Sequence, residues 1–330
     1  MNRILLSALC LPFLLHAIPY SVEEDQQRNV QAISNMVLEL QEFTMQVTVD
    51  GETNEHHIPE RSQTITTNAS ISFSDTISNI QGDQPRRIER EFSELRVSEM
   101  QEISAEGQDD VSAERTGTSL FEGQTVSLVL DGEEQWSASI EDNEDFDQGL
   151  LDKLTAHFGF VDFLPEGLQA EVGDTWDIPL EAFAQLRIPA GSLSFEFDQE
   201  SPFSGYGNQF IENLDGEFTA ELVEWDDEEE RAVIQLACQL QTSTSDGFEL
   251  ELEGAEGEVT RNSRIGFELE GELVWDLAQG CLRSMAMDGD ISTTVTITET
   301  IRPDDGPFDE RFKTQIMLLE GTLAHSLSVD

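Results

Sequence analysis

The sequence predicts a mainly β protein of the α+β class. Long antiparallel strands form a strongly curved sheet or open half-barrel of meanders, and a few short helices cap its concave face. Apolar residues recur at every second position over long stretches, and the residues between them are mostly polar or acidic. Helix-like segments are few and short. Such strands need a covered inner face, and a flat sandwich is the alternative architecture.

The clearest alternation lies in residues 265–277. Bulky apolar side chains occupy odd positions there and alternate mostly with Glu and Asp. They are Ile265, Phe267, Leu269, Leu273, Trp275 and Leu277. At 3.3 Å per residue the segment predicts a strand of about 13 residues with one wet face. The same alternation predicts strands at residues 218–225, 232–240, 248–252, 291–301 and 319–329.

The first half shows the same period except at its start. Residues 23–41 place apolar side chains at spacings of three and four, which predicts a short amphipathic helix. These side chains are Val30, Ile33, Val37 and Leu40. Alternation returns at residues 43–49 and 65–73 and predicts two strands. Residues 86–100 fit both periods, and we favour a strand because the segments on both sides are extended.

The middle of the chain combines a hairpin with short helices. Alternating segments on both sides of residues 131–132 (Asp-Gly) predict a hairpin. One-sided apolar residues predict helices at residues 150–158 and 180–186, with a short strand at residues 175–178 between them. Residues 189–207 are rich in Pro and Gly, so they predict a loop and the best boundary between two halves.

This pattern divides the chain into four parts. Residues 1–17 are predicted to be a signal peptide and residues 18–145 an N-terminal β-meander half. Residues 146–204 form a helical and loop joint, and residues 205–330 a C-terminal β-meander half. Whether the halves are independent domains stays open at this point.

The charge balance excludes two classes of partner. The chain has 68 acidic and 17 basic residues, a net charge of −51, with the acid spread along its whole length. Such a field repels nucleic acids and anionic membrane surfaces. A diffuse acidic surface with few lysines is typical of a strongly hydrated protein adapted to high salt. Capture of cations, including divalent ones, is the functional alternative.

The first 17 residues carry the features of a targeting signal. Arg3 precedes an uncharged apolar run at residues 4–15, which is too short to span a bilayer, and Ala17 offers a cleavage site. We therefore expect a periplasmic or secreted protein that is cleaved near Ala17. The rest of the sequence has no second long apolar run, which predicts no integral membrane span.

Two cysteines remain after the expected signal peptide. Cys238 and Cys281 would close a loop of about 40 residues as a disulfide in an oxidising compartment. Two separate buried thiols on strands are the alternative. The sequence leaves both open.

Motifs that carry chemistry are absent from the sequence. It contains no nucleophile elbow, zincin, phosphate-loop or dinucleotide motif, so we expect no enzyme, no catalytic residues and no cofactor. Adjacent side chains at residues 56–57 (His-His) diverge on an extended chain and predict no metal site. The acidic residues at 142, 144, 145 and 147 lack EF-hand spacing, so a solvated helix entry is favoured over a Ca²⁺ site.

Short motifs near the joint resemble a protein family. Residues 163–167 (Phe-Leu-Pro-Glu-Gly) followed by residues 172–176 (Val-Gly-Asp-Thr-Trp) resemble a motif, LPEG…VGDTW, of exported, highly acidic bacterial proteins of unassigned function. The strand at residues 271–277 is similar to their later hairpin, so the likeness covers about residues 120–300. The expected architecture also resembles periplasmic carriers such as LolA and LppX. Likeness of architecture does not transfer function, and it implies no catalytic residue.

The sequence therefore predicts an exported, non-catalytic binding protein. In the first hypothesis a curved sheet holds an apolar or lipid-like small molecule against its oily face. In the alternative, the protein has a solid core and its acidic exterior binds cations or basic partners at the surface or in the periplasm.

Overall fold

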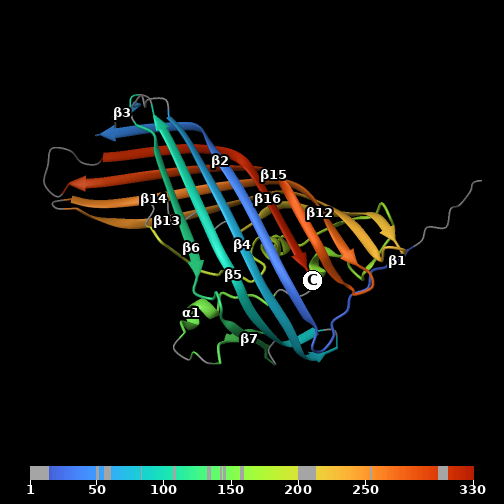
Figure 1. Cartoon of the computed structure of the whole chain (residues 1–330). Coiled ribbons are helices and arrows are strands. Elements are labelled where there is room, and N and C mark those ends of the chain that lie inside the picture. The colour runs from blue at the N-terminus through green and yellow to red at the C-terminus, as the bar shows by residue number, and fades with distance from the viewer. Residues whose placement is uncertain are drawn as a thin grey trace, which may run out of the picture.

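The computed structural model describes residues 15–49, 52–55, 61–82, 84–105, 107, 109–131, 135–141, 143, 146–156, 160–199, 213–252, 255–303 and 311–330. The described chain is mainly β, as predicted, and most of it lies in a 14-stranded sheet whose paired neighbours all run antiparallel (Figure 1). The N-terminal strands are β2 (Gln27–Val49), β3 (Glu52–Glu55), β4 (Arg61–Gln81), β5 (Gln84–Ala105), β6 (Val111–Ser119), β7 (Thr125–Leu130) and β8 (Trp136–Ser139). The later strands are β10 (Thr175–Asp177), β11 (Phe195–Phe197), β12 (Asp215–Asp226), β13 (Arg231–Leu252), β14 (Ala255–Asp276), β15 (Cys281–Pro303) and β16 (Arg311–Val329).

One continuous sheet contains strands from both halves of the chain. Its order is β10-β12-β13-β14-β15-β16-β2-β4-β5-β6-β11, and β16 pairs with β2 to join the C-terminal strands to the N-terminal ones. The sheet stays open, because β10 and β11 end the path without pairing to each other within the described strands. A separate two-stranded sheet pairs β1 (His16–Ala17) with β9 (Gln169–Ala170).

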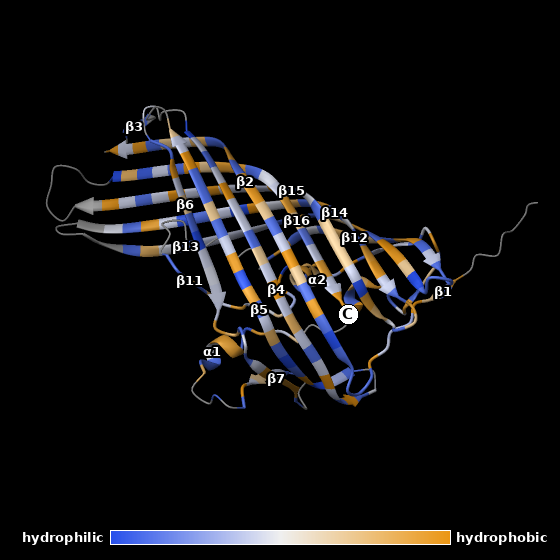
Figure 2. Ribbon diagram, in the orientation of Figure 1, coloured by the Kyte–Doolittle hydropathy of each residue, from blue (hydrophilic) through white to orange (hydrophobic). Residues whose placement is uncertain are grey.

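The predicted strands of the second half are confirmed, and several are longer than expected. The strand expected at residues 265–277 is β14, which has 22 residues. The segment expected separately at residues 248–252 is the continuation of β13. Figure 2 shows hydrophobic and hydrophilic residues alternating along these strands. The apolar set on odd positions of β14 is buried, which fixes the inner face.

The helix expected at residues 23–41 is wrong, because this segment forms most of β2. Its even-numbered side chains face inward, whereas Ile33 faces out and is 48% exposed. A β-bulge then changes the parity: Leu319 pairs with Leu40 and Leu318 with Glu42, so Gln41 is the extra residue. The helical spacing therefore combined side chains from both faces of one strand.

A second bulge explains why residues 86–100 fit two periods. Phe73 pairs with Phe92 and Ser72 with Glu94, which leaves Ser93 as the extra residue in β5. Phe92 and Leu95 are consequently buried on the same face although three positions separate them. The predicted strand is confirmed, and its spacing of three comes from the bulge.

Short helices of the joint cover the inner face. The predicted hairpin is β7 with β8, and the helix predicted at residues 180–186 is α2 (Glu181–Arg187). The helix predicted at residues 150–158 is shorter, as α1 (Gln148–Leu151), and residues 157–159 lie outside the described part. A 3₁₀ turn at Val161–Phe163 lies between them in sequence. Figure 1 labels α1, and Figure 2 shows α2 behind the long strands of the sheet.

Aromatic contacts attach this joint to the sheet. The Phe183 ring of α2 lies 5.2 Å from Phe267 of β14, measured between ring centroids. Phe163 and Phe183 both meet Phe218 of β12 edge to face. All four rings are buried, and such pairs contribute beyond their buried area. The inner face is therefore a packed core where the joint lies on it.

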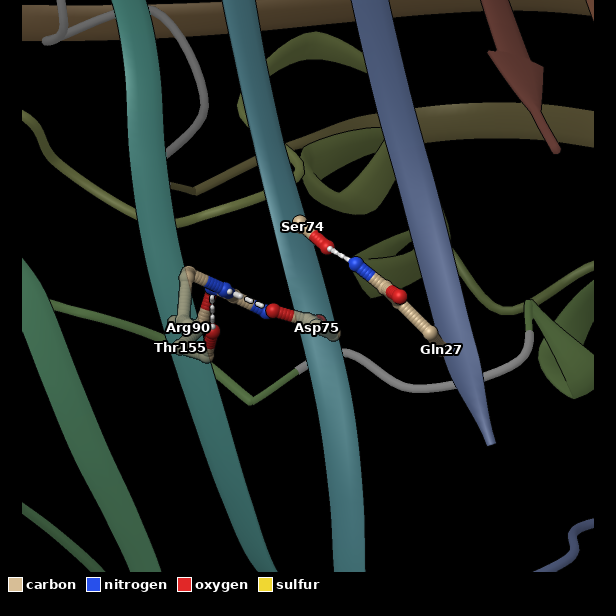
Figure 3. A network of polar contacts seen from close by, with 5 residues as sticks. All are labelled: Gln27, Ser74, Asp75, Arg90 and Thr155. Atoms are coloured by element: carbon tan, nitrogen blue, oxygen red, sulfur yellow. Dashed lines mark hydrogen bonds and ion pairs between the residues drawn. The ribbon is translucent and has the colours of Figure 1, made fainter. Parts of the chain in front are cut away.

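A buried ion pair makes a second attachment (Figure 3). Arg90 of β5 donates to both carboxylate oxygens of Asp75 in β4, at 2.7 and 2.8 Å, and to the carbonyl oxygen of Thr155 in the joint at 2.9 Å. Its guanidinium carbon also lies 4.2 Å from the centroid of the Phe73 ring. The Arg90 side chain is completely buried, so these contacts replace its hydration.

Replacing Arg90 with Met should destabilise the protein by about 3–5 kcal/mol, because Asp75 would remain buried without its partner. The measurement is urea unfolding. The double variant Arg90→Met/Asp75→Leu should recover part of the loss. The control Arg231→Met removes a partly exposed arginine that pairs with Glu224, and should cost under about 1 kcal/mol. Equal losses in the two single variants would contradict a structural role for the buried pair.

Glycines allow the sheet to bend where its strands approach most closely. A Cβ atom on Gly321 of β16 would lie 1.8 Å from the carbonyl oxygen of Val37 in β2. A Cβ on Gly216 of β12 would lie 2.1 Å from the Gln239 carbonyl oxygen in β13. Both obstacles are backbone atoms, which cannot rotate away as a side chain can. These approaches are typical of the glycine kinks that curve a sheet.

Substitution of Gly321 with Ala should therefore destabilise the protein by about 1–3 kcal/mol through overpacking. Gly247→Ala is the matched control in β13, since its added Cβ meets only the Val259 carbonyl oxygen at 3.7 Å. The control should be neutral or slightly stabilising. The two midpoints of urea unfolding check this, and an unchanged midpoint for Gly321→Ala would show that the close approach is unimportant.

Candidate functional site

A hollow of about 910 Å³ lies in the outer, polar face of the sheet. Six strands contribute to it, namely β2, β12, β13, β14, β15 and β16. Five carboxylates line it: Glu39, Asp215, Glu268, Asp290 and Glu320. No lysine or arginine is among the described residues that line it. The hollow thus concentrates negative charge in a concave surface, which focuses the electrostatic field.

The strand register places these carboxylates in two neighbouring rows. Glu268 of β14 pairs directly with Asp290 of β15, and Glu320 of β16 pairs with Glu39 of β2. Like charges directly opposite each other destabilise a sheet by a few tenths to about 1 kcal/mol per pair. In the described part of the chain none of the five carboxylates forms an ion pair. A cation in the hollow would relieve this repulsion.

Residues without charge shape the centre of the hollow. Gly266 of β14 pairs with Gln241 on one side and Ser292 on the other, so one row has no side chain at its middle. Gln241 donates to Asp215 at 3.1 Å and accepts from the guanidinium of Arg264. Arg264 therefore lies at the margin of the hollow and contacts an amide instead of a carboxylate.

The described side chains do not form a chelating metal centre. No group of three or more His, Cys, Asp or Glu converges within the described ranges in a way that could hold a metal ion. The histidines at residues 56–57 and the acids at residues 142, 144 and 145 lie outside those ranges. Asp147 accepts a hydrogen bond from the Gly149 backbone N–H at 2.8 Å and caps α1.

A second polar group lies on the inner face, at the end of α2. Nη1 of Arg187 donates to Oγ of Ser34 in β2 at 3.0 Å, and Ser34 pairs in register with His325 of β16. His325 is buried, and neither ring nitrogen makes a hydrogen bond of ordinary geometry to another described residue. Burial and the nearby Arg187 cation lower the pKa of His325 to about 3, while the Leu186 carbonyl acts in the opposite direction.

The structure describes Cys238 and Cys281 as free, buried thiols. Cys281 of β15 pairs with Asp276 of β14, and Asp276 pairs with Arg231 of β13. Arg231 lies seven positions from Cys238 along β13. That offset is about 23 Å along the strand at 3.3 Å per residue, too far for a disulfide. Burial raises the pKa of Cys238 to about 11 and also raises that of Cys281. Of the two alternatives, separate thiols are the one that the structure describes.

The structure describes the chain from residue 15, two residues before the expected cleavage site at Ala17. Residues 1–14 are outside the described part, and Ala17 belongs to β1. The His16 ring stacks on Trp225 with centroids 4.3 Å apart, and Ile18 is buried in the core. None of the helices in the described ranges is long and apolar enough to cross a membrane.

Sequence reasoning missed both polar groups because each assembles residues that are distant in the chain. Ser34, Arg187 and His325 belong to β2, α2 and β16. The available signal was His325, which occupies an odd position in the otherwise apolar series of residues 319–329. A polar side chain on a buried face indicates a special environment. No comparable signal distinguished the carboxylates of the hollow among 68 acids.

Comparison with known proteins identifies no family. No family model and no curated protein matches the chain. Solved structures aligned over most of the chain include an outer membrane channel of Pseudomonas putida F1, with 8% identity, 92% of this chain and 97% of that chain covered, and a TM-score of 0.17. OccK11 of Pseudomonas aeruginosa has 7% identity, with 94% of this chain and 100% of that chain covered and a TM-score of 0.15. Omp33 of Acinetobacter baumannii has 10% identity, with 93% of this chain and 99% of that chain covered and a TM-score of 0.12.

The pKa of His325 predicts a pH dependence of stability. A histidine whose pKa is lowered on folding stabilises the folded protein above pH 6.5, its ordinary pKa. This stabilisation is lost as the pH falls toward the pKa of the folded state. Between pH 6.5 and 5 the free energy of unfolding should fall by about 2 kcal/mol from this group. His325→Leu should remove that fall. Urea unfolding at several pH values checks this, and parallel pH profiles for both proteins would contradict it.

Proposed function

We propose that this protein is an exported, non-catalytic binding protein that uses the hollow of its outer face to bind a basic partner. The observation that carries the proposal is the hollow itself, which holds five carboxylates without a paired base in the described chain, four of them facing one another as two pairs across strands. A polycation would replace the unfavourable pairs Glu268/Asp290 and Glu320/Glu39 with favourable ones. The net charge of −51 would also steer such a partner toward the protein.

The spread of the carboxylates favours a chain of positive charges over a single metal ion. Divalent cations such as Ca²⁺ need six to eight oxygen ligands at 2.3–2.6 Å. The acids of the hollow come from five strands, and the described residues hold no converging ligand set. An extended segment rich in Lys or Arg matches rows of carboxylates across several strands. We therefore propose a basic peptide segment of another protein as the partner.

The apolar-ligand hypothesis has less support from this geometry. Both the 910 Å³ hollow and a smaller one of about 260 Å³ are lined mainly by outward-facing positions. On the inner face, Phe163 and Phe183 occupy the surface that an apolar ligand would use. A lipid would have to displace these rings. The solid-core alternative therefore agrees better with the packing.

Titration calorimetry with a hexalysine peptide tests the proposal. The double variant Glu268→Gln/Asp290→Asn should weaken binding by at least tenfold, because it removes one of the repelling pairs from the hollow. The affinity of the unaltered protein should fall steeply between about 50 and 500 mM salt, since exposed charges are screened. A hexaglutamine peptide should not bind.

The matched control is Glu102→Gln/Glu114→Gln, which removes two exposed carboxylates from β5 and β6, away from the hollow. It should change the affinity less than threefold. If both double variants lose affinity equally, the peptide binds the general field of the protein and the hollow is no site. If the unaltered protein does not bind hexalysine at low salt, the proposed function is wrong.

A further inference from the structure

Three polar residues lie together on the inner face at the end of α2: Arg187 donates to Ser34, and Ser34 pairs in register with His325. Arg187 has donors in addition to the one that contacts Ser34. The Ser34 hydroxyl accepts from Arg187, so its own O–H is free to donate elsewhere. A neutral His325 carries one N–H donor. The Leu186 carbonyl lies near His325 and acts on its pKa as an acceptor. A guanidinium, a hydroxyl and an imidazole N–H thus lie together, and no carboxylate of the described residues pairs with Arg187.

Two buried arginines of the inner face each have a carboxylate partner. Arg90 is paired with Asp75 and lies against Phe73. Arg115 is paired with Glu99 and lies 3.9 Å from the centroid of Phe197. Each of these cations has its carboxylate from the neighbouring strand. Arg187 forms no ion pair to any described residue, although the chain contains four times as many acidic as basic residues.

Charge and burial together indicate what would complete the group. Burial lowers the pKa of Arg187 to about 10, so the guanidinium remains charged at neutral pH. A partly buried cation without a counter-ion is unfavourable, and a guanidinium binds carboxylates through two parallel hydrogen bonds. His325 is 97% buried and its ring nitrogens have no regular partner in the described chain. Arg187 keeps some exposure, which gives a ligand an approach.

We propose that Arg187, Ser34 and His325 form a binding site for the carboxylate group of a small organic anion. The guanidinium of Arg187 takes both carboxylate oxygens, and the hydroxyl of Ser34 and the ring N–H of His325 donate to them. The ligand supplies the counter-ion that Asp75 supplies to Arg90 and Glu99 to Arg115. The site is independent of the hollow on the outer face, and it selects the opposite charge.

Two sources would provide this chemistry, a free small carboxylate and the headgroup of an amphiphile. Titration of the ¹⁵N-labelled protein with sodium acetate, sodium octanoate and octanol separates them. The Arg187 side-chain N–H and the His325 ring N–H signals report binding. Octanoate binding more tightly than acetate identifies an amphiphile, and equal affinities identify a free carboxylate; both results support the site. Octanol should not move these signals.

Arg187→Gln should weaken carboxylate binding by at least tenfold, which corresponds to the loss of a hydrogen bond to a charged group. The control Arg96→Gln removes an exposed arginine of β5 and should leave the affinity unchanged. If circular dichroism shows that the Arg187→Gln variant is unfolded, the variants Arg187→Lys and Ser34→Ala are measured instead. The lysine should bind more weakly than arginine because it lacks the planar fork, and Ser34→Ala should weaken binding several-fold.

Three results would overturn the site. The first is octanol moving the Arg187 and His325 signals as octanoate does, which would show apolar binding alone. The second is an Arg187→Gln variant that folds and binds the carboxylates with unchanged affinity. The third is no response of the unaltered protein to acetate or octanoate at concentrations up to about 50 mM, where a site of Kd near 1 mM would be saturated.

Discussion

Separation of apolar and acidic side chains onto the two faces of very long strands is the constraint on which this structure depends. Seven strands have 19 to 23 residues each. A register slip by one residue would turn the apolar set of a strand toward water and bury its acids, so the pairing is strongly specified. Bulges at Gln41 and Ser93 keep apolar side chains on the inner face while the strands twist.

Curvature and cover follow from the same constraint. A one-sided sheet must hide its apolar face, and here residues 160–193 do so through Phe163, Phe183 and Leu186. Arg90, which pairs with Asp75 in the sheet, ties the joint to the sheet by donating to the Thr155 carbonyl oxygen. Gly216 and Gly321, at close approaches between strands, line the hollow of the outer face. The two faces therefore offer opposite chemistry, an acidic hollow outside and, inside, Arg187, which forms no ion pair within the described ranges.

Individual residues show how far sequence reasoning reached. The apolar residues from Ile265 to Leu277 kept one parity, and the predicted strand was confirmed. The bulge in the β14–β15 pairing leaves Arg283 of β15 as the extra residue, so β14 keeps its period of two. Val30, Ile33, Val37 and Leu40 suggested a helix, because a period of two was mixed with the outward-facing Ile33, which is exposed, and Val37, which is half-buried. His325 was visible as a polar residue in an apolar series, yet its neighbours Ser34 and Arg187 were not, since nothing local relates them.

Alternation of side chains along the chain by itself determined the fold class, the long strands of the second half and the acidic character of the outer surface, because these depend on neighbours two residues apart. Tertiary structure alone decided that β16 pairs with β2, that Cys238 and Cys281 lie apart, and which few of the 68 acids share a hollow. Those outcomes depend on strand order and register, and contacts between residues more than 100 positions apart leave no periodic trace in a single sequence.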